Sequence, residues 1–136
     1  MLNRMTPARG RLSGLVLAAM ILGTGALAAT PALAAWDAIA VDDDTKTAGG
    51  DAGYGVGTGD SKKEAESMAM SKCKEEGNKG CAVEVSYKDM CGAYASSKKY
   101  AGHGTGKTKA EAAKAAKDTC GDAACKVVVT DCVGED

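Results

Sequence analysis

The chain is poor in several residue types, and each shortage limits what the protein can do. It has 136 residues but no phenylalanine, one tryptophan and one histidine. All three arginines lie within the first 11 positions and both prolines within the first 31. Beyond residue 34, 14 lysines face 18 acidic residues, a formal net charge of −4. An acidic segment without arginine is poorly suited to bind nucleic acid, and this length fits a single domain.

The first 34 residues have the three-part pattern of a secretory signal peptide. Three arginines precede an uncharged, Leu- and Ala-rich run over residues 12–29, and Ala32 and Ala34 form a small-residue cleavage site. The run is near the lower length limit of a membrane span, but glycines dilute it and no cluster of positive charges follows. We therefore predict cleavage after Ala34, export of residues 35–136 to the periplasm or the medium, and no stable membrane insertion afterwards.

Six cysteines follow the predicted signal segment, at positions 73, 81, 91, 120, 125 and 132. An even number of cysteines in a short exported domain indicates a disulfide framework. A zinc site would favour closer cysteine pairs and more than one histidine, and the C-x-x-C pair of a redox enzyme is missing. We therefore predict disulfides, with no metal and no cofactor. Such cross-links would support a core that is thin for a domain of this size.

The sequence contains an internal repeat with an offset of 47 residues. From Gly55 to Cys73, nine of the 19 positions are identical to those of the segment from Gly102 to Cys120. Two copies of one structural unit, covering about residues 36–88 and 91–132, are the simplest interpretation. The domain is therefore expected to be a single unit built from two similar halves.

Each copy is predicted to fold as strand, strand, helix, strand. The second strand of each copy alternates glycine with a side chain, so one of its faces is bare and another backbone or a large ring can approach it closely. The helices begin at S/T-x-x-E capping boxes, Ser61–Glu64 and Thr108–Glu111, and end at Gly77 and Gly121. This predicts an α+β fold in which two ββαβ-like repeats form an antiparallel sheet with two helices packed on it. The predicted strands are 36–41, 53–58 and 81–87 in the first copy, and 91–96, 100–105 and 125–132 in the second.

Small residues form one face of each predicted helix. In the first copy the helix ends at Cys73 and the next strand opens at Cys81, and Cys120 and Cys125 have the same places in the second copy. The repeat therefore predicts the bridges Cys73–Cys81 and Cys120–Cys125, which leaves Cys91–Cys132 as the third. The predicted faces are Ala65, Met68, Ala69 and Cys73, and then Ala112, Ala115, Ala116 and Cys120.

These residues resemble the bacterial family called domain of unknown function 4189. The similarity covers nearly the whole predicted mature chain, from the opening Trp36–Val41 through Cys81-Ala82-Val83 and Cys91-Gly92-Ala93 to the closing Cys125–Val129. The resemblance implies an exported, cysteine-rich domain and carries over no catalytic residue. In relatives the second strands often hold aromatic residues, whereas here they are mostly glycine.

Three motifs with possible chemistry have simpler explanations. Residues 101–108 fit a permissive phosphate-loop pattern, but a glycine strand followed by a capped helix explains both copies, and we expect no nucleotide binding. The acidic run Asp42–Asp44, with Asp51 beyond, offers oxygen ligands for calcium, but its spacing is not that of an EF-hand and acidic runs are usually solvated. His103 has no identifiable nucleophile as a partner, so no catalytic residue is assigned.

The leading hypothesis is a non-enzymatic binding protein of the cell envelope, such as an inhibitor or an immunity-type protector. Its partner would be an envelope or secreted protein, contacted through exposed aromatic side chains. The alternatives are a small cell-wall hydrolase that uses paired carboxylates and a host-facing secreted factor. The candidate contact residues are Trp36, Tyr54, Tyr87, Tyr94 and Tyr100.

Overall fold

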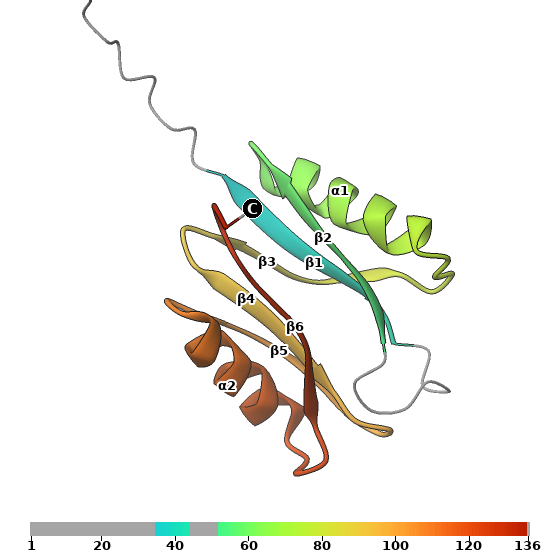
Figure 1. The fold of residues 1–136 in the computed structure, drawn as a ribbon, viewed down its shortest axis with the longest axis vertical. Coiled ribbons are helices and arrows are strands. Elements are labelled where there is room, and N and C mark those ends of the chain that lie inside the picture. Colours follow the sequence, from blue (N-terminus) through green and yellow to red (C-terminus); the bar gives the residue numbers. More distant parts are fainter. Residues whose placement is uncertain (1–34, 44–51, 136) are drawn as a thin grey trace, which may run out of the picture. The chain divides into compact units, whose positions relative to one another are not determined.

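The computed structural model describes residues 35–43 and 52–135, so the predicted signal segment lies outside the described residues. Both copies have the expected order of elements (Figure 1). No helix within the described ranges is long and apolar enough to cross a membrane. The first copy consists of β1 (Trp36–Asp42), β2 (Gly53–Gly59), α1 (Lys62–Glu75) and β3 (Ala82–Lys88), and the second of β4 (Cys91–Ser96), β5 (Ala101–Gly106), α2 (Lys109–Cys120) and β6 (Lys126–Cys132).

The predicted α+β class is confirmed, and the structure divides the strands into two sheets. One sheet has the order β2-β1-β3 and the other β5-β4-β6, and all pairs are antiparallel. The first strand of each copy is the central one, because the two later strands of the same copy pair with its two edges. Each copy therefore forms a three-stranded sheet of its own, and among the described strands no pairing joins the two sheets.

The bare glycine faces of β2 and β5 are filled by the backbones of the two helices. A Cβ atom added to Gly57 would lie 2.2 Å from the amide nitrogen of Ala69, and one on Gly104 would lie 2.4 Å from that of Ala116. Two residues of a strand advance about 6.8 Å and four residues of a helix about 6 Å. The glycine spacing in β2 therefore matches the spacing of Ala65, Ala69 and Cys73, and the helix lies flush on the strand.

The buried helix faces are narrower than predicted. Ala65, Ala69 and Cys73 are fully buried, as expected, but Met68 is 44% exposed. Met68 lies to the side of the contact between α1 and β2. Its counterpart Ala115 is partly buried, and its Cβ would lie 2.5 Å from a Cβ added to Gly104. The helices begin as predicted, since Ser61 Oγ accepts a hydrogen bond from the amide of Glu64 and Thr108 repeats the contact with Glu111.

The second face of each sheet packs against the other sheet. Tyr87 of β3 and Tyr94 of β4 are 2% and 1% exposed in this core. The hydroxyl of Tyr87 donates to Asp131 Oδ2 on β6, and that of Tyr94 donates to Asp43 Oδ2 beyond β1, each over 2.7 Å. Each tyrosine therefore links its own copy to the other. The buried members of this core are Ile39, Val41, Ala52, Val85, Tyr87, Tyr94 and Val129.

Three disulfides reinforce this architecture. Cys73–Cys81 and Cys120–Cys125 each tie the end of a helix to the segment that leads into the last strand of its copy. Cys91–Cys132 joins two residues that face each other directly on β4 and β6. These are the pairs expected from the repeat, and no described cysteine is free. Three disulfides indicate an oxidising location outside the cytoplasm.

Candidate functional site

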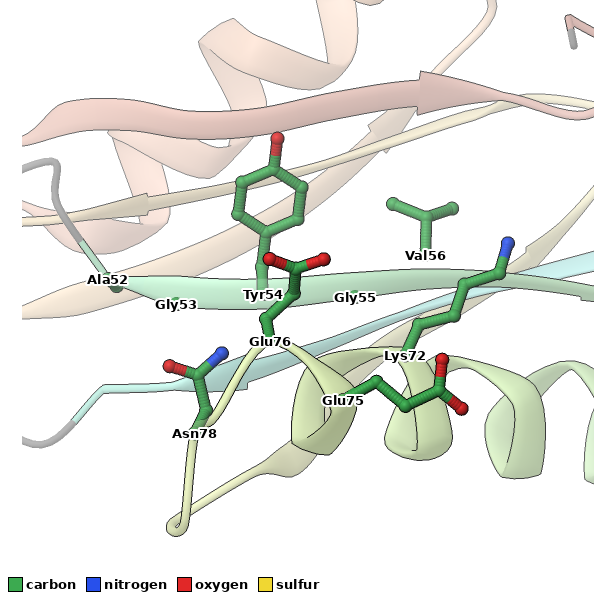
Figure 2. Close-up of a pocket in the computed structure, with 9 residues that line it drawn as sticks. All are labelled: Ala52, Gly53, Tyr54, Gly55, Val56, Lys72, Glu75, Glu76 and Asn78. Atoms are coloured by element: carbon green, nitrogen blue, oxygen red, sulfur yellow. The ribbon is translucent and has the colours of Figure 1, made fainter.

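An open groove of about 640 Å³ lies beside β2, next to the last turn of α1. Figure 2 shows Tyr54 and Val56 rising from β2, with the side chains of Lys72, Glu75 and Glu76 extending from the end of the helix. The groove thus has a strand as its floor and a helix end as one wall. The lining residues are Ala52, Gly53, Tyr54, Gly55, Val56, Lys72, Glu75, Glu76 and Asn78.

The floor of the groove is the outer edge of β2. This strand pairs with β1 on one side, from Gly53 opposite Asp42 to Gly59 opposite Trp36. Within the described ranges no strand pairs with its other side. In an antiparallel pair alternate residues direct their amide and carbonyl groups away from the partner. About half of the β2 residues therefore present unpaired main-chain groups toward the groove side.

The helix wall is predominantly negative. The side chains of Lys72 and Glu76 form no ion pair with any described residue, and Glu75 accepts a hydrogen bond from Ser71. The carbonyl groups at a helix C-terminus add partial negative charge, which usually favours a cation. Asn78 donates to the carbonyl of Cys73 over 2.8 Å and so caps this end. Two acids at the end of a helix make the groove attractive to a positive charge.

The second copy lacks these features at the matching positions. With the offset of 47, Tyr54 corresponds to Ala101, and Lys72 to Thr119. Glu76 corresponds to Ala123, so only one acid remains at that helix end. The repeat therefore retains the scaffold in both copies, while the aromatic and paired acidic side chains occur in the first copy alone.

The five candidate aromatic residues differ in their exposure to solvent. Tyr87 and Tyr94 belong to the core between the sheets and are not available to a partner. Trp36 is partly buried against the cluster beneath α1. Tyr54 and Tyr100 are exposed, at 43% and 56%, but only Tyr54 lines the groove. Burial thus reduces the predicted set to one aromatic residue within a formed site.

A pair of carboxyl groups lies between the two sheets. Asp37, on β1, is 2% exposed, and its Oδ1 has no hydrogen-bond partner among the described residues. Burial raises the pKa of Asp131; the hydrogen bond from Tyr87 lowers it and the nearby charge of Asp37 raises it further. Burial and the bond to Asp131 raise the pKa of the Tyr87 hydroxyl far above its usual value, so it remains a donor. Neither aspartate lines the groove.

Replacing Asp131 by asparagine is expected to stabilise the protein at neutral pH. Between the usual pKa of 3.8 and the raised pKa of Asp131, the folded state binds a proton that the unfolded chain does not. The free energy of unfolding therefore falls as the pH rises through this window. In Asp131→Asn the amide oxygen still accepts from Tyr87, and its NH₂ group is positioned to donate to Asp37. A new hydrogen bond to a charged group contributes about 1.5–3 kcal/mol.

Thermal unfolding from pH 3 to pH 8 measures this effect. The control is Asp118→Asn, which alters an exposed carboxylate that pairs with Lys114 and should change little. If the wild type and Asp131→Asn show the same dependence on pH, or if the variant is the less stable at pH 7, the two carboxyl groups do not repel each other in the fold.

The acidic loop after β1 is partly used for structure. Asp42 Oδ2 accepts from the amides of Lys79 and Gly80, both over 2.9 Å, and so holds the loop that follows α1. Asp43 accepts from Tyr94. Asp44 and Asp51 lie outside the described residues. Within the described ranges no group of three or more His, Cys, Asp or Glu residues is placed to hold a metal ion.

The segment that resembles a phosphate loop lies where β5 meets α2. A phosphate loop follows a parallel strand of a nucleotide-binding sheet, whereas β5 is an edge strand antiparallel to β4. The carboxylate of Glu111 accepts from the amide of Lys107, and Thr108 caps the helix, so the helix start already has its acceptors. His103 is exposed on β5 opposite Tyr94. The segment therefore consists of the strand β5 and the capped start of α2.

The comparison with protein families shows a match over most of the chain. The model of a domain of unknown function, DUF4189, matches residues 36–132. The chain belongs to the DUF4189 family. It matches no curated protein and no solved structure at a significant level. The DUF4189 assignment covers both copies of the repeat and all three disulfides, and it assigns no activity.

Two features of this DUF4189 domain were not predicted from its sequence. The groove was missed because it depends on α1 ending beside β2. The available signal was the pair Glu75 and Glu76, because acidic residues are unfavourable at a helix C-terminus. The buried Asp37 was missed as well. It alternates with Ile39 and Val41 along β1, and this inward register was the available signal.

Proposed function

We propose that this DUF4189 domain is an exported, non-enzymatic binding protein whose partner is a protein of the cell envelope or its surroundings. Residues 1–34 act as its secretory signal, and the mature domain works in the periplasm or outside the cell. Inhibition of the partner or protection against it is the form of activity that fits best. Neither role requires a catalytic set or a cofactor.

The groove beside β2 is the observation that supports this proposal. It combines a strand edge that pairs with no other described strand, an exposed tyrosine, and the charges of Lys72 and Glu76, which form no ion pair with a described residue. Disulfides hold the scaffold around it, and a rigid surface binds with less loss of conformational freedom. The carboxyl pair Asp37 and Asp131 does not line this groove, so it gives the groove no pair of carboxylates for the alternative of a hydrolase.

A capture experiment tests the proposal. The full chain is expressed with residues 1–34 in place and recovered by its tag in oxidised form, and its mass shows whether cleavage follows Ala34. Envelope and culture extracts of the source cell are then passed over it, with reduced and alkylated protein as the control. We expect one protein to be retained in stoichiometric amount by the oxidised form alone. Retention of no protein, or equal retention by both forms, would contradict a binding role of the folded domain.

A further inference from the structure

We propose that the groove accepts an extended segment of the partner protein, which adds as a strand to the free edge of β2 and places a basic side chain against Glu75 and Glu76. This inference rests on the proposed binding function. It adds the mode of binding and the chemistry of the segment that is bound.

The first support is that β2 is an unprotected edge strand. Natural edge strands are usually blocked by charged side chains, proline or bulges. The sequence of β2, GYGVGTG, contains no charge and no proline, and its register with β1 has no shift. The opposite edge strands differ, because β3 and β6 contain charged residues and show a register shift against their neighbours. The edge of β2 is thus available for pairing with another strand, whereas charged residues and register shifts disfavour pairing at the edges of β3 and β6.

The second support is the shape of the groove. An added strand would lie on the outer edge of β2 and alternate its side chains between the two sides of the sheet. On one side they would meet Tyr54 and Val56, which stand on the same side of β2 in Figure 2. On the other side they would meet the end of α1, with Lys72, Glu75 and Glu76. A groove between a strand edge and a helix is a recurring site for strand addition.

The third support is the charge at the helix end. Among the residues of the helix end that line the groove, Glu75 and Glu76 outnumber Lys72, whereas Lys74 of the same turn does not line it. The carbonyl end of α1 adds to the negative potential of the two acids. A lysine or arginine on the bound segment is therefore favoured on this side. A second copy of the chain is a poorer occupant, because its own β2 has no basic residue to meet these acids.

Selection from a displayed library of random 12-residue peptides tests the inference. The oxidised chain recovered after export is the target. We expect enriched peptides to combine alternating apolar or β-branched residues with a lysine or arginine. Their affinity should fall about tenfold for Glu75→Lys/Glu76→Lys, and by less in 0.5 M salt, because exposed charge pairs are screened. Tyr54→Ala should weaken binding several-fold, and bound peptide should slow amide exchange along β2.

A matched control separates local from overall charge. Asp118→Lys/Glu135→Lys changes the net charge by the same amount, and both acids lie in exposed ion pairs away from the groove. This variant should bind the selected peptides within twofold of the wild type. Failure to enrich any peptide, equal losses in both double variants, or protection of another strand would overturn the inference. So would a dimer in sedimentation experiments whose formation slows amide exchange along β2, since a second copy would then be the occupant.

The outcomes for the two proposals can be distinguished. If the extracts yield a partner whose binding is unchanged in Glu75→Lys/Glu76→Lys, the binding function stands and the inference on β2 fails. If selected peptides bind β2 but the extracts yield no partner, the strand-addition site stands and the assignment of an envelope partner fails.

Discussion

Replacing Gly57 by alanine is expected to lower the free energy of unfolding by about 3 kcal/mol, the upper end of the range for overpacked sites. The added Cβ would lie 2.2 Å from the amide nitrogen of Ala69 and 2.4 Å from the carbonyl oxygen of Ala65. Both are backbone atoms of α1, so no change of side-chain rotamer relieves the contact. The helix would have to move away from the strand, which would open the small-residue contact along its length.

Whether Gly57→Ala raises or lowers the free energy of unfolding tests the close contact between α1 and β2. At a position with enough space, glycine to alanine stabilises a protein by about 0.4–1 kcal/mol, because the unfolded chain loses freedom. Urea unfolding monitored by circular dichroism distinguishes a gain of stability from a loss. Thr58→Ala, an exposed neighbour on the same strand, is the control and should change stability by less than about 1 kcal/mol. A Gly57→Ala midpoint at or above that of the control would show that α1 does not rest on β2 this closely.

The second copy provides an independent repetition. A Cβ on Gly104 would lie 2.4 Å from the amide nitrogen of Ala116 and 2.5 Å from the Cβ of Ala115. Gly104→Ala should therefore destabilise the protein to a similar extent. If only one of the two substitutions lowers the stability, α1 and α2 pack on their strands at different distances, despite the shared pattern of glycine and alanine.

Local signals made most of the fold predictable. The capping boxes at Ser61 and Thr108 determined where the helices begin, because each depends on contacts within four residues. Gly121 ends α2 with a φ of 71°, a conformation that glycine adopts without a penalty. The alternating strands followed from residue pattern alone. The offset of 47 then supplied the equivalence of the two halves, and with it the pairs of cysteines.

Features that depend on contacts between distant segments were less accessible. Whether six strands form one sheet or two depends on which edges pair, and both solutions have the same pattern of alternation. Met68 was placed on the buried face because helical periodicity cannot tell how wide a contact is. The groove requires β2, the last turn of α1 and Asn78 to meet in space. No local pattern in the sequence encodes that meeting.

The two copies thus separate scaffold from site. The positions they share are the glycines, alanines and cysteines that seat a helix on a strand. The positions at which they differ include Tyr54 and the acids at the end of α1. A repeated scaffold tolerates such differences because the exposed positions do not take part in the helix contact. Function in this domain is therefore best sought where the first copy departs from the second.

Removal of the Cys91–Cys132 bridge is expected to cost more stability than removal of either local bridge. This bridge closes a loop of 41 residues in sequence separation, compared with 8 for Cys73–Cys81 and 5 for Cys120–Cys125. On the loop-entropy model the long bridge contributes about 4 kcal/mol and each short bridge about 2 kcal/mol. Small domains are stable by only about 5–15 kcal/mol. The variant Cys91→Ala/Cys132→Ala should therefore have little stability left at 37 °C.

Cys120→Ala/Cys125→Ala is the matched control, because it also removes two sulfur atoms and one cross-link from the second copy. Urea unfolding of both variants, with thiol titration to verify that the remaining four cysteines are still paired, isolates the effect of loop length. Equal losses would indicate that the bridges act through contacts in the folded state. A larger loss for the short bridge would indicate that its main role is to secure the end of α2. If the long bridge costs more, as expected, then Cys91–Cys132 acts mainly by keeping the unfolded second copy compact. In the native state, hydrogen bonds and packing between β4 and β6 already hold the same strands together.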